Sequence, residues 1–261
     1  MSDMVEHMTP DEFRRHGYAL VDWLANYRET VEEHPVFSQV EPGAIASMLP
    51  DRAPEQAEPF EDLIADLDRV VMPGVTHWQS PSWFAYFPAN ASPPSILAEL
   101  VSAGLGMQGM LWSTSPVVTE VENRVLDWMV DLLGLPEQWK TTELGGGVIQ
   151  MSASDATHVA LVVAREQAID RGTSEEMAVY VSDQAHSSIE KGCNVADIGH
   201  CRKVPVDTEF GMDIECLRRM IDDDVAQGVV PTAIVSAIGT TATTAVDPLD
   251  EIGELARAHG M

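Results

Sequence analysis

The spacing of apolar residues along the 261-residue chain changes from a helical repeat in the first third to short runs typical of buried strands in the last third. Residues 10–33 place apolar side chains three and four positions apart and predict one amphipathic helix. Thr9 is its expected N-cap, with Pro10 at the first helical position and Glu12 three residues after the cap. Residues 60–71 predict a second, short helix after a proline-rich linker. Little of this surface faces inward, so we expect the segment to lie on another surface, such as a second subunit.

From residue 73 to residue 95 the chain is rich in both aromatic residues and prolines. This composition suits the wall of a binding pocket built from loops, and it suits a packing cluster beneath a long loop equally well. Helical spacing resumes over residues 96–103 and 117–133. The second of these helices is followed by Gly134 and Pro136, which are typical stop signals.

The last third of the chain alternates between β-branched apolar runs and amphipathic segments. Strands are expected over three segments: 177–182, 202–206 and 232–238. Helices are expected between and after them: 185–193, 213–226 with Asp213 as its N-cap, and 250–259. Such alternation predicts an α/β fold with a largely parallel sheet and with ligands at the carboxyl ends of its strands.

The stretch 145–157, GGGVIQMSASDAT, joins a flexible glycine lead-in, a possible buried strand at 148–151 and the start of a helix over 155–168. A turn of small residues at a helix start directs unpaired N–H groups, serine hydroxyls and the positive end of the helix dipole at one place, which suits a phosphate. An ordinary N-cap by Ser154 explains the same residues. No Gly-Lys-Ser/Thr follows and the glycines precede the strand, so the stretch is neither a P-loop nor a dinucleotide-binding fingerprint.

Polar residues directly follow the predicted strands. Residues 183–188 include His186, and residues 239–247 contain several threonines and end in an aspartate. Because the carboxyl ends of parallel strands meet at one edge of a sheet, these loops and the serines at 152–154 bring hydroxyls, an imidazole and a carboxylate to one rim. His186 is therefore a candidate catalytic residue, although a lone histidine is more often structural.

Acidic residues outnumber basic ones by 42 to 15, which gives a formal net charge of -27 and argues against nucleic acid or an anionic membrane as a partner. The acidic residues are spread along the chain, so the run 222–224 is interpreted as solvated surface and no metal site is expected. Three cysteines without a C-x-x-C pair predict a reduced, cytoplasmic protein. No apolar run is long enough for a membrane span, and the N-terminus has no signal-peptide pattern.

Five segments together resemble the N-terminal half of the pyridoxal-phosphate (PLP)-dependent group II decarboxylases of the aromatic-L-amino-acid decarboxylase type. They are HWQSPSWFAYFPA from His77, LWSTSPVVTEVE from Leu111, GGGVIQMSASDAT from Gly145, SDQAHSSIEKG from Ser182 and AIGTTATTAVDPL from Ala237. Each segment is a weak signal alone, but the five occur in the family's order and spacing over nearly the whole chain. The resemblance implies an α/β fold of PLP fold type I, the aspartate aminotransferase-like fold, with a mostly parallel sheet that is incomplete in this chain.

The resemblance also implies roles for the matching residues. Ser152, Ala153 and Ser154 would bind the cofactor phosphate, in agreement with the chemistry expected of the helix start. His186 would stack on the pyridine ring, beside the group that is protonated after CO2 leaves. Thr241 would lie beneath or beside that ring.

Further site residues follow from the same resemblance. Asp247 resembles a carboxylate near the cofactor that supports the pyridinium side of the ring. The substrate side chain would contact a set of mainly aromatic residues, part of it donated across a dimer interface: Trp78, Tyr86, Phe87, Pro88, Gln108 and Met110. Gln108 and Met110 stand where family members often carry an aliphatic and an aromatic residue. A roomier pocket that favours indole or hydroxyphenyl side chains is therefore expected.

The family's Schiff-base lysine and the aspartate that pairs with the pyridine nitrogen lie in motifs that do not occur in these 261 residues. Lys140, Lys191 and Lys203 stand in other contexts. We therefore expect residues 1–75 to be an N-terminal helical dimerisation segment and residues 76–261 to be the first part of the PLP-binding large domain. A second polypeptide is expected to supply the remainder and the C-terminal small domain, in a homodimer of such pairs, and a truncated chain is the competing explanation.

The functional hypothesis is PLP-dependent decarboxylation of an aromatic L-amino acid to the corresponding amine and CO2, by one half of a two-chain enzyme. An aromatic aldehyde synthase is the alternative within the same family. A non-catalytic or regulatory subunit of a PLP enzyme is the alternative from another class.

Overall fold

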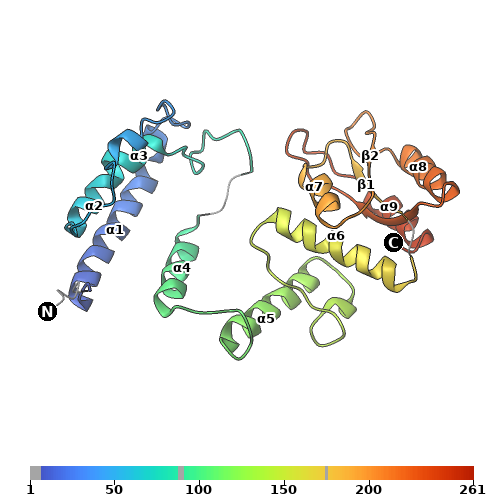
Figure 1. The fold of residues 1–261 in the computed structure, drawn as a ribbon, viewed down its shortest axis with the longest axis horizontal. Helices are drawn as coiled ribbons and strands as arrows, with labels where there is room; N and C mark the ends of the chain where they lie inside the picture. The colour runs from blue at the N-terminus through green and yellow to red at the C-terminus, as the bar shows by residue number, and fades with distance from the viewer. Residues whose placement is uncertain (1–6, 88–90, 174–175) are drawn as a thin grey trace. The chain divides into compact units, whose positions relative to one another are not determined.

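A computed structural model describes residues 7–87, 91–173 and 176–261. The chain forms two compact units, which divide between Leu100 and Val101 and are described separately (Figure 1). The predicted functional boundary after residue 75 lies inside the first of these units. Within the described residues, no helix combines the length and the apolar character needed to cross a membrane.

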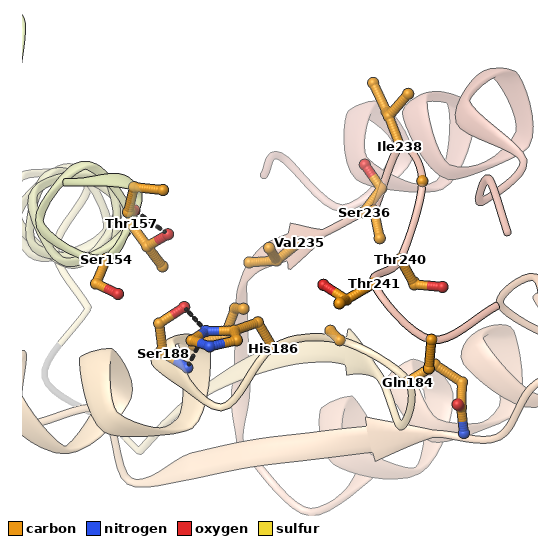
Figure 2. A pocket seen from close by; sticks show the side chains of 16 residues that line it. Ser154, Thr157, Gln184, His186, Ser188, Val235, Ser236, Ile238, Thr240 and Thr241 are labelled. Atoms are coloured by element: carbon orange, nitrogen blue, oxygen red, sulfur yellow. Dashed lines mark hydrogen bonds between the residues drawn. The ribbon is translucent and has the colours of Figure 1, made fainter. Parts of the chain in front are cut away.

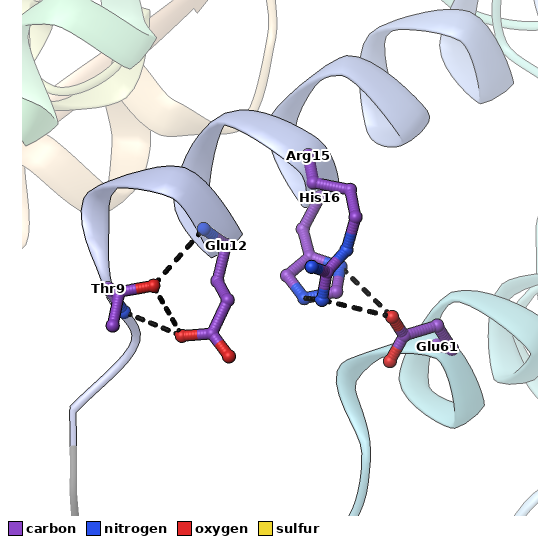
Figure 3. A network of polar contacts seen from close by, with 5 residues as sticks. All are labelled: Thr9, Glu12, Arg15, His16 and Glu61. Atoms are coloured by element: carbon purple, nitrogen blue, oxygen red, sulfur yellow. Dashed lines mark hydrogen bonds and ion pairs between the residues drawn. The ribbon is translucent and has the colours of Figure 1, made fainter.

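The first unit is built mainly of helices. Its elements are α1 (Pro10–Thr30), the 3-10 turns Val31–Glu33 and Ala46–Met48, α2 (Phe60–Asp66), the π turn Leu67–Val71, α3 (Met72–Gly74) and the start of α4 (Pro93–Leu105). The predicted capping box is confirmed, because Thr9 Oγ1 accepts from the Glu12 N–H at 3.3 Å and Glu12 Oε2 accepts from the Thr9 N–H at 2.8 Å. Figure 3 shows this box, and it shows Arg15 reaching Glu61 of α2 at 3.4 Å.

The second unit begins with helices that precede the sheet: α5 (Pro116–Leu132), the 3-10 turn Glu137–Trp139 and α6 (Ala153–Asp170). The strand predicted at 148–151 is wrong. The segment forms no ladder, and its three apolar side chains are exposed, Met151 at 96%. No strand of the described chain lies beside it, so the Ile149 N–H bonds instead to Glu122 Oε1 at 2.8 Å. An extended segment becomes a strand only where a neighbouring strand completes its hydrogen bonds.

The sheet of the second unit has three parallel strands in the order β2-β1-β3, which confirms the predicted parallel α/β arrangement. The strands are β1 (Met177–Ser182), β2 (His200–Val204) and β3 (Val230–Val235). The helices that follow them are α7 (Ser188–Val195), α8 (Ile214–Ala226) and α9 (Leu249–Ala258). The predicted limits of β1 and the predicted N-cap Asp213 of α8 are confirmed.

The core consists of two clusters on opposite faces of β1, since successive side chains of a strand point to opposite faces. Val179 and Val181 pack with residues of α6 and α7, while Ala178 and Tyr180 pack with residues of α8 and α9. Figure 1 shows the sheet between these helix pairs. Every residue of β1 is buried, which explains its nearly continuous apolar sequence.

The edge strand β3 differs from its prediction at both limits, and it begins at Val230 instead of residue 232. It ends at Val235 instead of residue 238, because Ile238 leaves the ladder and forms an antiparallel bridge with Val246. Most of β3 is only half-buried, with Thr232 buried. An apolar strand at an uncovered sheet edge offers its free backbone groups to another strand.

Candidate functional site

A pocket of about 600 Å³ opens at the carboxyl ends of the strands in the second unit (Figure 2). Three segments contribute its lining: the start of α6, the loop after β1 that leads into α7, and the loop after β3. The lining residues are Ala153, Ser154, Thr157, Gln184, Ala185, His186, Ser188, Ile189 and residues 235–242. Four of the residues that the resemblance assigns to the site therefore meet here, namely Ala153, Ser154, His186 and Thr241.

The start of α6 presents unpaired backbone donors. Ser152 is the N-cap, and its Oγ accepts from the Asp155 N–H at 3.1 Å and donates to Asp155 Oδ2 at 2.9 Å. The alternative of Ser154 as the cap is therefore wrong, since the helix begins earlier than expected. The first helical hydrogen bond runs from the Ala156 N–H to the Ser152 carbonyl, which leaves the N–H groups of Ala153 and Ser154 without helical acceptors. Ser154 also adds a hydroxyl beside the positive end of the helix dipole, and together these donors suit an anion.

His186 is held by one of its two ring nitrogens. The backbone N–H of Ser188 donates to His186 Nδ1 at 3.1 Å, and Ser188 Oγ lies 3.0 Å from the same atom. Because Nδ1 accepts the backbone hydrogen, the neutral ring carries its proton on Nε2. Ser188 is buried at the start of α7, so it fixes the ring from the protein side. Figure 2 shows His186, Ser154 and Thr241 reaching the pocket from three different segments.

Asp247 occupies a different environment from the other predicted site residues. Its side chain is 2% exposed and lies outside the pocket lining. Oδ1 accepts from the Met212 N–H at 2.8 Å and Oδ2 from the Ala237 N–H at 2.6 Å. The carboxylate is thus directed at backbone groups, and Ser152, which acts as the cap, also lies outside the lining.

Gln108 and Met110, the two residues of the second unit that are expected to contact the substrate, do not line this pocket. Gln108 and Met110 are exposed, Met110 at 75%. In the first unit, Trp78 stacks on Trp83 with ring centroids 4.4 Å apart and on Tyr86 at 6.0 Å. Phe87 is likewise exposed, and Pro88 lies outside the described residues. We call Trp78, Trp83 and Tyr86 the aromatic cluster.

No lysine lines the pocket among the described residues. Lys140 pairs with Asp131 at 2.6 Å and Glu137 at 3.2 Å, and Lys203 lies 3.5 Å from Glu190. Lys191 is exposed on α7. The lysines of the described residues therefore bring no primary amine to the pocket.

The thiol of Cys193 lies in the core beneath α7 and is not a candidate nucleophile. Burial raises the pKa of Cys193 to about 12, and the neighbouring Cys201 adds to the shift. A thiol with such a pKa stays protonated near neutral pH.

Several lining residues were not singled out from the sequence: Thr157, Gln184, Ser188, Ser236 and Thr240. Gln184, Ser188 and Thr240 stand in the loops that directly follow the predicted strands, and that position is the signal that could have identified them. Ser188 matters most among them, because its N–H fixes the tautomer of His186.

The parallel three-stranded sheet, with helices on both faces and a pocket at the carboxyl ends of its strands, has the fold of the large domain of α/β PLP enzymes of fold type I. A family model described as "Pyridoxal-dependent decarboxylase conserved domain" matches residues 42–261, and the chain belongs to this family, the group II PLP decarboxylases that include the aromatic amino acid decarboxylases.

Similar proteins include a phenylacetaldehyde synthase from Arabidopsis thaliana, 42% identical over 99% of this chain and 54% of that protein. An aromatic-L-amino-acid decarboxylase from Cavia porcellus is 40% identical over 97% of this chain and 55% of that protein. The crystal structure of Catharanthus roseus tryptophan decarboxylase in complex with L-tryptophan matches with a TM-score of 0.92 and 38% identity, covering 98% of this chain and 55% of that one. The chain thus spans about half the length of the curated relatives it matches.

Proposed function

We propose that this chain forms the phosphate-binding and ring-binding part of a PLP-dependent enzyme that converts an aromatic L-amino acid into its amine and CO2. The observation that carries the proposal is the pocket where the start of α6, His186 and Thr241 meet. When bound, PLP supplies an electron sink for the electron pair left behind by the departing CO2.

The residues present fit the phosphate end and the ring face of PLP. The free N–H groups of Ala153 and Ser154, with the Ser154 hydroxyl, match a phosphate, and Ser152 orders them as the N-cap. His186 contributes a flat ring that the Ser188 N–H holds at Nδ1, and Thr241 contributes a hydroxyl from the loop after β3.

The proton chemistry assigned to His186 follows from its hydrogen bonds. Since the Ser188 N–H occupies Nδ1, any proton that His186 holds or transfers in the pocket is carried at Nε2. Nε2 makes no hydrogen bond within the described residues, so this atom is free to face a bound molecule. We assign to His186 the role of a catalytic residue that stacks on the ring and handles the proton that replaces CO2.

An aromatic substrate is supported by two observations. The similar proteins are phenylacetaldehyde synthases, tryptophan and tyrosine decarboxylases and aromatic-L-amino-acid decarboxylases. The first unit also carries exposed aromatic side chains, among them Tyr86 and Phe87. We assign substrate contact to Trp78, Tyr86, Phe87, Pro88, Gln108 and Met110.

The amine and the acid that the chemistry also requires are assigned to polypeptide outside these 261 residues. Three observations support this assignment: the half-length match to relatives, the absence of a lysine from the described pocket lining, and the outer edge of β3, with which no described strand pairs. We propose a second chain as their carrier, in a homodimer of such pairs. Intact mass of the purified native protein tests this directly: a companion polypeptide supports the two-chain enzyme, and one longer chain that contains this sequence contradicts it.

Aldehyde formation is the second candidate activity, because several of the similar proteins are phenylacetaldehyde synthases and one similar structure is a 4-hydroxyphenylacetaldehyde synthase. Product analysis of the native protein with L-tryptophan, L-tyrosine and L-phenylalanine separates the two, since an amine and an aldehyde differ in mass. A native complex that binds PLP but forms neither product would indicate a non-catalytic subunit.

The replacement His186→Ala tests the assigned role. We expect turnover to fall by about 10²–10⁴-fold, the usual contribution of a general acid or base, while PLP stays bound. His200→Ala is the matched control, because His200 pairs with Glu176 at 2.6 Å and lies outside the pocket lining. Unchanged turnover in His186→Ala, measured as CO2 release, would remove His186 from the mechanism.

A further inference from the structure

The loop after β3 that carries Thr240 and Thr241 is closed at its neck by residues 237 and 247. The Asp247 N–H donates to the Ala237 carbonyl at 2.9 Å, and the Ala237 N–H donates back to the Asp247 side chain at 2.6 Å. The next pair toward the loop tip is the antiparallel bridge between Ile238 and Val246. Residues 239–245 between them form the loop tip, and residues 239–242 of this tip line the pocket.

The same carboxylate ties this neck to a second loop. Asp247 Oδ1 accepts from the N–H of Met212, which is 1% exposed and belongs to the core cluster beneath α8. Gly211, next to Met212, packs so closely that a Cβ atom there would lie 3.3 Å from the Val246 carbonyl oxygen. Asp247 therefore connects the pocket loop to the hydrophobic core through one buried side chain.

The tip does not hold its shape through regular structure. Thr240 and Thr243 share a hydroxyl contact of 2.6 Å, and the Gly239 and Thr240 N–H groups both donate to the Ala245 carbonyl. Thr244 adopts a φ of 57°, in the left-handed region that β-branched residues avoid. A loop that contains an unfavourable backbone conformation persists only where its surroundings enforce it.

We propose that Asp247 is a positioning residue, which fixes Thr240 and Thr241 at the pocket by clamping the backbone at Ala237 and Met212, and that it does not touch the bound cofactor. Both carboxylate oxygens are engaged by backbone donors, and the side chain is buried away from the pocket lining. The role of Thr241 toward PLP rests on the proposed function, whereas the clamp itself does not.

Asp247→Asn breaks the clamp at constant size, because the amide NH2 group must face one of two backbone donors. Loss of a hydrogen bond to a charged acceptor is expected to speed exchange of the Ala237 or Met212 amide hydrogen by about tenfold or more. Asp250→Asn is the matched control, an exposed carboxylate in the first turn of α9, and it should leave both amides unchanged. Unchanged exchange in Asp247→Asn would overturn the clamp.

The wild-type chain provides a test that needs no folded variant. The Ala237 amide hydrogen should exchange at least about tenfold more slowly than that of Thr241, whose N–H has no hydrogen-bond acceptor among the described residues. Equal rates would contradict a formed clamp.

PLP affinities of single and double variants of the native protein test whether Asp247 acts on the pocket through this loop. Thr241→Ala should weaken PLP binding by several-fold in the wild type and have little further effect in Asp247→Asn, because the loop is already displaced there. Ser154→Ala, which removes the hydroxyl assigned to the phosphate at the start of α6, should weaken PLP binding equally in both backgrounds. Additive effects of Thr241→Ala would show that Asp247 does not act through the loop. Failure of the wild type to bind PLP would contradict the proposed function, and the amide measurements would still decide on the clamp.

Discussion

The strand β1 and the helix α4 are both strongly apolar in sequence, yet β1 is completely buried and α4 is largely exposed. All six residues of β1 are buried between layers of helices. Among the described residues, none of α4 is buried, and Leu100 is 52% exposed. Apolar composition therefore does not create a core by itself. A core requires a second layer to close over the apolar face.

The helix α5 follows the pattern of α4. Val117, Trp128 and Leu132 are more than half exposed along its length. Exposed apolar patches of this extent mark surfaces that contact another protein surface. Residues 153–261 supply both layers around β1, whereas α4 and α5 leave much of their apolar surface exposed.

The largest expected effect comes from Leu217→Ala in the buried region. Leu217 is fully buried in the cluster beneath α8, so the cavity should cost about 2–5 kcal/mol of the free energy of unfolding. Leu100→Ala on α4 removes the same atoms from an exposed site and should change stability by about 0.5 kcal/mol or less. Urea unfolding of both variants measures the difference. Equal costs would mean that α4 is covered in solution.

A medium effect is expected at the partly buried ion pair between Arg202 of β2 and Asp224 of α8. Asp224 receives two hydrogen bonds from Arg202, the shorter at 2.6 Å, and one from the Tyr180 hydroxyl at 2.8 Å. Asp224→Asn should therefore cost about 1–3 kcal/mol at pH 7. Asp222→Asn, an exposed neighbour on α8, should cost little.

The same variant carries a pH signature. Burial alone would raise the pKa of Asp224, but the hydrogen bonds from Arg202 and Tyr180 outweigh it and hold the pKa below its ordinary value. A lowered pKa stabilises the fold above the unfolded-state value of about 3.9, and this stability is lost as pH falls through the folded-state pKa. The gap in unfolding free energy between wild type and Asp224→Asn should therefore narrow below about pH 4. A constant gap down to acid pH would contradict the assigned pKa direction.

The smallest expected effect lies in the first unit, at the capping box of α1. Thr9→Ala removes the acceptor of the Glu12 N–H and should make the amide hydrogens of the first turn exchange about fivefold faster. Thr30→Ala, which removes a hydroxyl at the other end of α1, should leave that turn unchanged. An unchanged first turn in Thr9→Ala would mean that contacts with another surface hold it.

The features predicted correctly from the sequence depend on neighbouring residues. The Thr9 capping box, the limits of β1 and the Asp213 N-cap all follow from residues a few positions apart. One additional rule, that parallel strands end at the same edge, predicted that His186 and Thr241 meet at one pocket. Ala153 and Ser154 reach the same pocket from the start of α6, which no strand precedes directly. The five family-like segments then supplied the family, which the comparisons confirm.

The features that the sequence did not predict depend on partners distant along the chain. Residues 148–151 have the composition of a strand, but no described strand lies beside them. Asp247 is an acidic residue in a polar loop, and only its distances to the Met212 and Ala237 N–H groups indicate a clamp. By itself the sequence determined most helices and strands and the polar residues that follow the strands. These features arise from hydrogen bonds between near neighbours and from the spacing of apolar residues. The tertiary structure decided which backbone donors each polar side chain meets, because residues 35 positions apart come together only when the layers pack.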